Sequence, residues 1–238
     1  MNFFADLIDL ILPQHCAGCG GAPVLLCDTC ATPLRAPARP ARTSPRGLPP
    51  PWTVAAYEGP LRAILAAYKE HGRTALAVPL GEALATAVRA ALPPTPAAAM
   101  PLRADRTSRP CHAPPMLVWV PSSRAATRRR GHDALRGIVD VAVRRLRAEG
   151  VPVTAAAALR QRRRVADQAA LTAAQRIANL EGALEVSPRA EVAGRQVVLV
   201  DDVVTTGASL AEAARALRTA NAAPLAAATI ATTPRHHP

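Results

Sequence analysis

The chain has 238 residues, of which 50% are hydrophobic but only 3% aromatic, so its core must be built mainly from Ala, Val and Leu. No stretch is long and apolar enough to suggest a transmembrane span, which argues against an integral membrane protein. The formal net charge of +12 favours an anionic partner such as phosphate, nucleic acid or a membrane surface. Because the excess of Arg and Lys falls within residues 61–175, it indicates either a shaped anion site or a solvated basic surface.

The first 13 residues, MNFFADLIDLILP, are apolar but contain Asp6 and Asp9 and are too short to span a bilayer. Their apolar residues follow helical spacing, which predicts a short docking helix that ends at Pro13. Because the segment lacks a basic start, we expect a cytoplasmic protein with no membrane insertion.

Two Cys-x-x-Cys pairs lie in CAGCGGAPVLLCDTC, and their members are Cys16, Cys19, Cys27 and Cys30. Four thiolates suffice for tetrahedral Zn²⁺, and the glycines between them permit the tight turns that aim both sulfurs of a pair at one ion. A redox dithiol or disulfides are the alternatives, but a cytoplasmic chain rarely keeps structural disulfides. The spacing therefore predicts a structural zinc site.

Residues 31–50 are rich in Pro and Arg and are interpreted as a linker. We therefore expect an N-terminal region, residues 1–50, with the helix, the zinc module and this linker, and a larger domain over residues 51–238.

The larger domain begins with WTVAAYEGPL, which predicts a short strand and turn, and LRAILAAYKEHGR, which predicts a helix that ends near Gly72. Lys69 in this helix is the only lysine of the chain, which suggests a need for a compact ammonium and makes it a candidate catalytic residue. A second helical run, PLGEALATAVRAAL, precedes a Pro-rich, aperiodic stretch that we interpret as a flexible insertion near residues 93–115. Cys111 in this insertion is assigned no role.

The remaining chain alternates strand-like and helix-like runs: MLVWVP, a helix near 132–149, VPVTAAAAL, a helix near 169–180, QVVLVDDV, a helix near 208–220, and LAAATIA. This alternation, with continuous apolar strands, predicts an α/β fold whose mostly parallel sheet is covered on both faces. Ligands of such sheets bind at the carboxyl ends of the strands.

The strongest functional motif is VVLVDDVVTTGAS, residues 197–209, in which a buried strand, an acidic pair and a small-residue loop precede a helix. Hydroxyl groups and backbone amides at a helix N-terminus suit a phosphate monoester, whereas the two carboxylates suit ribose hydroxyls or Mg²⁺. The candidate ribose 5-phosphate site comprises Asp201, Asp202, Val203, Val204, Thr205, Thr206, Gly207, Ala208 and Ser209.

This motif resembles the 5-phosphoribosyl 1-diphosphate (PRPP) motif of type I phosphoribosyltransferases. Together with the cysteine module and segments near 61–73, 119–135 and 162–184, the chain resembles the ComF competence family. The resemblance implies an α/β fold with a type I phosphoribosyltransferase-like parallel sheet flanked by helices, preceded by a small N-terminal zinc-binding module. The sequence departs from the family at His132 and Asp133, where the family usually has an aromatic residue and Asn.

By the same resemblance, Ser122, Ser123 and Arg124 are candidates for binding the diphosphate, with Asp201 and Asp202 as tentative Mg²⁺ ligands. Arginines that could approach a hood over the diphosphate lie at 128–130, 160 and 162–164, with Gln168, although a solvated basic face is the alternative. Arg176 and Asn179 match a family helix and are not assigned a catalytic role.

The resemblance implies transfer of phosphoribosyl from PRPP to an unassigned acceptor with release of diphosphate, in the context of DNA uptake. Oxopurine salvage is disfavoured, because the corresponding enzymes usually carry an Asp where this chain has Thr205. One alternative is a non-catalytic DNA-uptake accessory that binds single-stranded DNA or a helicase partner. Another is a zinc module that docks a partner on a scaffold domain, and oligomerisation stays open.

Overall fold

The computed structural model describes residues 15–93, 113–122, 124–131, 133–163 and 173–234. The N-terminal segment expected to form a docking helix lies outside these residues, as does most of the predicted insertion. Among the described residues, no helix combines the length and apolar character that crossing a membrane requires.

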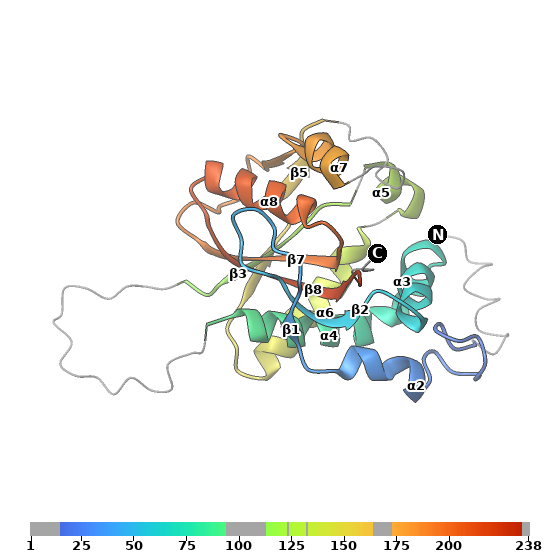
Figure 1. The fold of residues 1–238 in the computed structure, drawn as a ribbon. Helices are drawn as coiled ribbons and strands as arrows, with labels where there is room; N and C mark the ends of the chain where they lie inside the picture. Colours follow the sequence, from blue (N-terminus) through green and yellow to red (C-terminus); the bar gives the residue numbers. More distant parts are fainter. Residues whose placement is uncertain (1–14, 94–112, 123, 132, 164–172, 235–238) are drawn as a thin grey trace, which may run out of the picture.

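A six-stranded sheet in the order β1-β2-β8-β7-β3-β4 forms the centre of the fold (Figure 1). The strand bounds are Arg39–Pro40 (β1), Trp52–Ala56 (β2), Met116–Trp119 (β3), Thr154–Ala156 (β4), Gln196–Val204 (β7) and Ala223–Thr232 (β8). From β2 to β4 all neighbours are parallel, and β1 lies antiparallel on the edge of β2.

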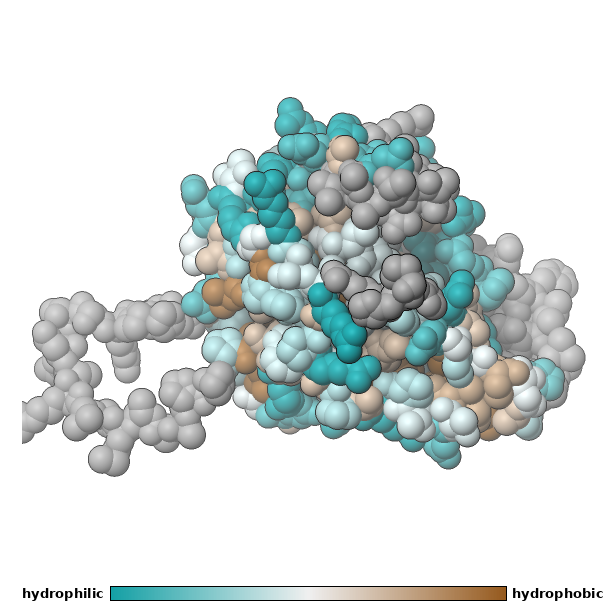
Figure 2. All heavy atoms as spheres, in the orientation of Figure 1, coloured by the Kyte–Doolittle hydropathy of each residue, from teal (hydrophilic) through white to brown (hydrophobic). Residues whose placement is uncertain are grey.

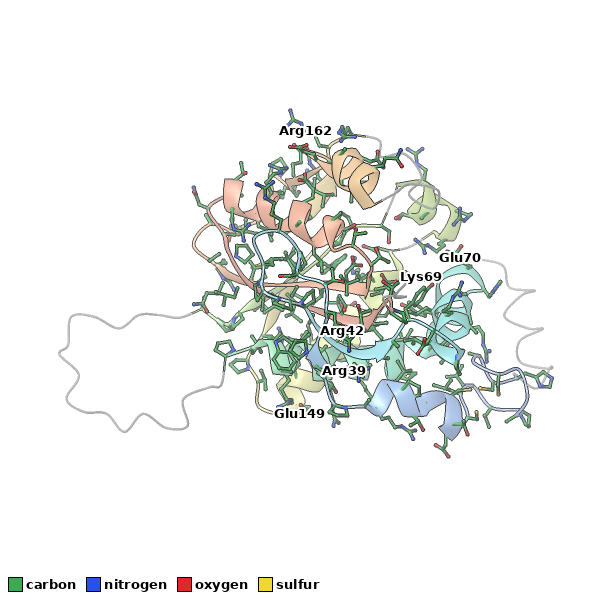
Figure 3. The ribbon with its side chains drawn as sticks, viewed as in Figure 1. Arg39, Arg42, Lys69, Glu70, Glu149 and Arg162 are labelled. Atoms are coloured by element: carbon green, nitrogen blue, oxygen red, sulfur yellow. The ribbon has the colours of Figure 1, made fainter. Side chains whose placement is uncertain are left out.

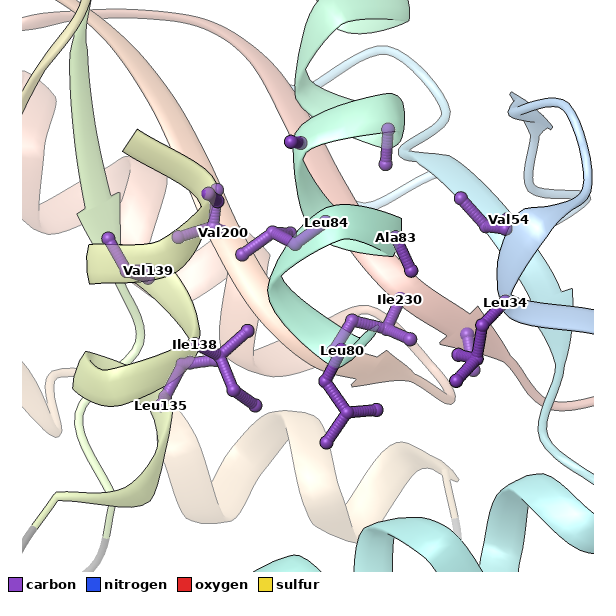
Figure 4. Close-up of a cluster of buried hydrophobic side chains, with 14 of the residues drawn as sticks. Leu34, Val54, Leu80, Ala83, Leu84, Leu135, Ile138, Val139, Val200 and Ile230 are labelled. Atoms are coloured by element: carbon purple, nitrogen blue, oxygen red, sulfur yellow. The ribbon is translucent and has the colours of Figure 1, made fainter. Parts of the chain in front are cut away.

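Helices cover both faces of this sheet, as expected of buried parallel strands. One face packs against α3 (Pro60–Glu70), α4 (Ala77–Ala91) and α6 (Ala134–Ala148), and the other against α8 (Ala208–Thr219). Strand residues alternate between the two cores: Val198 and Val200 face the three-helix side, whereas Val197 and Leu199 face α8. Figure 4 shows Val200 and Ile230 of the sheet with Leu80 and Leu84 of α4 in the first of these cores.

Shorter elements complete the fold. Their bounds are Asp28–Ala31 (α2), Thr32–Arg35 (η1, a 3₁₀ turn), Thr74–Leu76 (η2, also 3₁₀), Arg124–Arg130 (α5), Leu159–Gln161 (β5), Ala173–Leu180 (α7) and Leu184–Val186 (β6). Strands β5 and β6 form a separate antiparallel pair. Figure 2 shows hydrophilic residues over the upper part of the molecule, where this pair and α7 lie.

The fold class expected from the sequence is confirmed: a mostly parallel sheet is flanked by helices, with a four-cysteine cluster near the N-terminus. One detail was wrong, because VPVTAAAAL does not form a single strand. Strand β4 joins the main sheet, and the chain then turns so that Leu159 enters the core beside α8. The local sequence is apolar throughout and gives no turn signal there.

The Pro- and Arg-rich segment after the cysteines is packed onto the larger body. Residues 41–48 lie along α8, with Ala41 and Leu48 buried in the core on that side of the sheet. From Ala41 to Arg46, buried and exposed residues alternate. This segment therefore behaves like an extended strand with one face against the domain, although it carries few large apolar residues.

Candidate functional site

The order in which the chain adds strands to the sheet reverses between the neighbouring strands β3 and β7. After β3 the chain passes through α6 to β4 on one side, whereas after β7 it passes through α8 to β8 on the other. In open α/β sheets a ligand crevice lies outside the carboxyl ends of the two strands at such a reversal. Both phosphate-binding segments expected from the sequence follow these two strands, so the topology brings them to the same edge.

The end of β7 carries the acidic pair, and α8 begins four residues after the strand ends. Gly207 is the N-cap residue of α8 with φ of +77°, a conformation that favours glycine. Thr205 is exposed, Thr206 and Ser209 are half-buried, and Ala208 N–H approaches Thr206 Oγ1 at 3.4 Å. The turn thus places hydroxyl groups and the first helical amides at one helix N-terminus, an arrangement that suits a phosphate group. Val204 is buried and Val203 half-buried beside them.

Lys69 comes from the last turn of α3 (Figure 3). It nevertheless lies beside the acidic pair of β7. Its ammonium forms an ion pair with the carboxylate of Asp202. Burial raises the pKa of Asp201 to about 7, an effect that Lys69 partly offsets and Asp133 reinforces. Burial also lowers the pKa of Lys69, with attraction from Asp201 acting in the opposite direction. The site therefore holds a lysine and two carboxylates in a partly dehydrated setting, where each charge depends on the others.

The loop after β3 is held by Asp133, a residue that the sequence comparison had noted only as a departure. The Asp133 carboxylate accepts hydrogen bonds from Trp119 Nε1 at 2.8 Å, Ser122 Oγ at 3.2 Å and the backbone N–H of Leu135 at 3.2 Å. It thereby caps α6 and fixes the predicted diphosphate loop to that helix. Val120 N–H donates to Val200 O at 3.0 Å, which sets the loop beside β7. Ser123 lies outside the described residues.

Arg124 begins α5, of which the structure describes only the backbone at that residue. At the other end of the helix, Arg129 and Arg130 form ion pairs with Glu70 at 3.0 and 3.5 Å. Glu70 follows Lys69 on α3, so the arginine-rich helix is attached next to the lysine (Figure 3). In this arrangement the two arginines neutralise a protein carboxylate.

Tyr68 connects the same turn of α3 to α6. Its hydroxyl donates to Ala134 O at 2.7 Å and occupies the space where a side chain on Gly137 would begin, 2.8 Å away. Burial, with repulsion from Asp133 and Asp140, raises the pKa of Tyr68 to about 12. The phenol therefore stays protonated and keeps α3, and with it Lys69, in register with α6.

The remaining hood candidates lie near the β5–β6 pair. Arg160 pairs with Glu185 of the opposite strand at 2.9 Å, and Arg163 donates to the carbonyl oxygens of Asn179 and Glu181 at 3.0 and 2.8 Å. Figure 3 shows Arg162 at the outer edge of the molecule. Arg164 and Gln168 lie outside the described residues, and the structure describes only the backbone of Arg176. Arg160 thus connects strands β5 and β6, and Arg163 connects the chain after β5 to the end of α7.

The four N-terminal cysteines converge, with their sulfur atoms all within 4.8 Å of one another. Cys27 Sγ lies 3.6 Å from Cys16 Sγ and 3.9 Å from Cys19 Sγ. Tetrahedral zinc with Zn–S bonds of about 2.3 Å implies sulfur separations of about 3.8 Å, so the cluster fits this ion. None of the four forms a disulfide. A Cβ on Gly18 would lie 2.6 Å from Cys30 Sγ, which explains glycine at this turn.

The cysteine cluster is closed and packed against the domain. Cys16 and Cys30 are each 2% exposed and belong to the same core as α3 and α4. Burial opposes ionisation of Cys16, but backbone N–H groups of Cys27, Cys19 and Gly18 together outweigh it and lower its pKa to about 6. Burial raises the pKa of Cys30 to about 12. Four thiol groups around one point leave no open coordination position, which indicates a structural rather than a catalytic metal.

Residues 138–237 match the family model of the phosphoribosyl transferase domain. The match includes the acidic pair, the loop after it, α8 and β8. The cysteine cluster, Lys69 and the loop after β3 precede the matched residues. No curated protein sequence matches the chain. The chain thus combines a segment that matches the phosphoribosyl transferase domain with a four-cysteine cluster that could bind zinc.

Proposed function

Proceeding from the phosphoribosyl transferase match, we propose that the protein binds PRPP in the crevice at the carboxyl ends of β3 and β7. Asp201 and Asp202 accept hydrogen bonds from the ribose hydroxyls, and residues 203–209 hold the 5-phosphate at the N-terminus of α8. One observation carries this proposal: the N-terminus of α8 follows the acidic pair of β7 within a few residues. This turn lies where the strand order reverses and within residues 138–237, which match the phosphoribosyl transferase domain.

The diphosphate of PRPP lies, in this proposal, against the loop after β3, with Ser122, Ser123 and Arg124 as donors. Ser122 must exchange its hydrogen bond to Asp133 for one to the ligand. Mg²⁺ suits the carboxylate oxygens of Asp201 and Asp202, and would neutralise charge on the diphosphate. In the reaction the bond from ribose C1 to the diphosphate oxygen breaks, the diphosphate keeps the electron pair, and an acceptor nucleophile bonds to C1.

Lys69 is the candidate catalytic residue of this scheme. Its ammonium is compact, partly dehydrated and already at the crevice through its ion pair with Asp202. When ribose hydroxyls donate hydrogen bonds to the Asp202 carboxylate, they weaken its ion pair with Lys69. The ammonium can then turn toward the departing diphosphate and stabilise its charge. Arg129 and Arg130 can likewise leave their ion pairs with Glu70 and turn toward the diphosphate.

The finer family assignment is also part of the proposal. The cysteine cluster, followed by this domain, supports a protein of the ComF competence type that acts in DNA uptake. Zn²⁺ is then a structural ion that joins Cys16, Cys19, Cys27 and Cys30. Thiols held by a metal rather than by disulfides favour a reducing compartment such as the cytoplasm.

The alternative proposal, a non-catalytic accessory that binds single-stranded DNA or a helicase, is supported mainly by the net charge of +12. Base stacking receives little support, because Trp119 and Tyr68 are buried and Trp52 and Tyr57 are half-buried. These four are all the Trp and Tyr residues of the chain. Several of the central arginines are also engaged within the protein, including Arg129, Arg160 and Arg163.

Isothermal titration calorimetry with PRPP, with and without Mg²⁺, tests the proposal. We expect binding that strengthens with Mg²⁺ and that weakens at least tenfold in Asp201→Asn. Asp140→Asn, a change of an exposed carboxylate on α6, should leave affinity unchanged. Binding of a fluorescent oligonucleotide without any binding of PRPP at millimolar concentration would overturn the proposal and favour the DNA accessory. Release of diphosphate in the presence of candidate acceptors then separates transfer from binding alone.

A further inference from the structure

The segment 41–48, here called the strap, lies against the candidate phosphate loop. Thr43 is 9% exposed, and its hydroxyl donates to the carbonyl oxygen of Thr205 at 3.3 Å. A Cβ on Gly207 would lie 2.9 Å from Pro45 Cγ, closer than real Cβ atoms approach, and 3.2 Å from Pro45 Cβ. Two successive inward-facing residues of the strap thus contact the two ends of the turn from Thr205 to Gly207.

Both ends of the strap are fixed independently of this contact. At its start, β1 pairs with β2, and Ala41 N–H donates to Pro51 O at 2.7 Å. At its other end, the guanidinium of Arg218 on α8 bonds to Gly47 O, and Leu48 is 6% exposed in the core. Leu48 N–H also donates to Pro45 O at 3.0 Å, which closes the turn. The strap is therefore held in place before any ligand is present.

The hydrogen bond from Thr43 determines the orientation of one peptide plane in the loop. In a planar trans peptide, the carbonyl oxygen of one residue and the N–H of the next point in opposite directions. Because Thr205 O accepts this bond from the strap, the N–H of Thr206 points away from the strap. Without this bond the peptide plane could turn, and the carbonyl oxygen of Thr205 would then point where that N–H points now.

We propose that the strap positions the loop for a phosphate monoester, with Thr43 and Pro45 as positioning residues of the 5-phosphate site. This inference rests on the proposed function, because it takes residues 203–209 to be the loop that holds the phosphate. In this proposal the phosphate binds on the side of the loop away from the strap, where the N–H of Thr206 points. It gives the segment between the cysteine cluster and the domain a role in ligand binding.

The test compares Thr43→Val, which removes the hydroxyl and keeps the shape, with Thr43→Ser, which keeps the hydroxyl. Affinities are measured by calorimetry for two probes, ribose 5-phosphate and inorganic diphosphate with Mg²⁺. Thr43→Val should weaken ribose 5-phosphate binding about fivefold to tenfold. Affinity for inorganic diphosphate should stay unchanged, and Thr43→Ser should bind both probes as the wild type does. Thr86→Val, which alters an exposed hydroxyl of α4, is the matched control.

The outcomes separate this inference from the proposed function. If the wild type binds neither probe nor PRPP, the proposed function fails. If the wild type binds and Thr43→Val binds ribose 5-phosphate equally well, or loses affinity for both probes to the same degree, the strap has no positioning role. Should Thr43→Val fold poorly, Pro45→Ala provides the same comparison, since it removes the contact with Gly207 and leaves the Thr43 hydrogen bond.

Discussion

Lys69 of α3 and Asp202 of β7 form an ion pair at the carboxyl edge of the sheet, with the lysine side chain 30% exposed and the aspartate side chain 12% exposed. The pair connects the candidate catalytic residue with the acidic pair of the proposed ribose site. Because both groups are largely withdrawn from water, each charge stabilises the other, and loss of either leaves a buried charge without a partner.

Replacement of Lys69 by Met should lower the free energy of unfolding by about 2 kcal/mol, because Asp202 then keeps a poorly solvated carboxylate. Asp202→Asn should also destabilise the protein, and the double variant should lose less than the sum of the two. Urea unfolding of the ligand-free proteins measures this coupling. The exposed pair Arg136–Asp140 should show almost none, and additive effects at Lys69 and Asp202 would contradict the assigned pairing.

Purified protein should contain about one equivalent of zinc, and Cys27→Ser should lose most of it. Cys16 and Cys30 belong to the core on the α3 and α4 side, so loss of the metal should also lower the thermal midpoint. A colorimetric zinc assay and a thermal melt check both effects. Cys111→Ser, which leaves these four cysteines unchanged, should retain the metal. A wild type that contains no zinc, and whose thermal midpoint equals that of Cys27→Ser, would refute the site.

Glu212 of α8 is 6% exposed, accepts the backbone N–H of Leu184 at 3.0 Å and pairs with Arg215 at 2.7 Å. Burial opposes its ionisation, but Arg215 and the Leu184 amide outweigh burial and hold the pKa of Glu212 below 4.5. A depressed pKa stabilises the fold at pH above the unfolded value, and this contribution is lost as pH falls through the folded pKa.

Glu212→Gln should therefore reduce the free energy of unfolding by about 2 kcal/mol near neutral pH, and by less as the pH falls below about 4.5. Urea unfolding at several pH values checks the difference between the two proteins. Glu185, the partner of Arg160, is more exposed than Glu212. Glu185→Gln should therefore lower the free energy of unfolding by about 0.5 kcal/mol or less. A difference that grows toward acid pH would contradict the ionised assignment of Glu212.

Gly207→Ala should be more damaging than Gly194→Ala, although both residues have positive φ, +77° and +70°. A side chain at 194 meets no atom within 4 Å, so that variant pays only for its backbone conformation, about 1 kcal/mol. At 207 the new methyl group also meets Pro45. Thermal unfolding compares the two, and Pro45→Ala should recover part of the loss at 207 but none at 194. Equal losses at both glycines would argue against the strap contact.

The central part of the fold could be predicted from sequence because the signals there are local. The apolar run of β7, the acidic pair and the amphipathic helix α8 follow one another within 24 residues, Gln196 to Thr219. The cysteine cluster is similarly encoded by spacing alone. In both cases the residues that meet in space are neighbours in the chain.

Other features depend on contacts between residues that are distant in the chain, and local sequence patterns predict them only in part. Helix α5, RAATRRR, has no apolar stripe, and two of its arginines instead pair with Glu70 of another helix. Asp133 could have been identified as a helix cap, since it precedes a periodic apolar run, but its bonds to Trp119 and Ser122 could not. The strap lies within residues 31–50, for which the Pro- and Arg-rich composition predicted a linker, although the alternation of Ala41, Thr43 and Pro45 with polar residues is a strand-like signal.

The path of the N-terminal chain has a consequence for any shortened form of the protein. Between Cys30 and Leu48 the chain leaves the core on one face of the sheet, runs as β1 along the edge of β2, and enters the core on the other face. Removal of the first 50 residues would uncover apolar surface on both faces at once and expose the hydrogen-bonding edge of β2. Such an edge invites pairing between molecules. The properties of a truncated domain would thus reflect self-association rather than the loss of zinc. Single substitutions at the cysteines are the sounder way to separate the role of the zinc cluster from that of the larger domain.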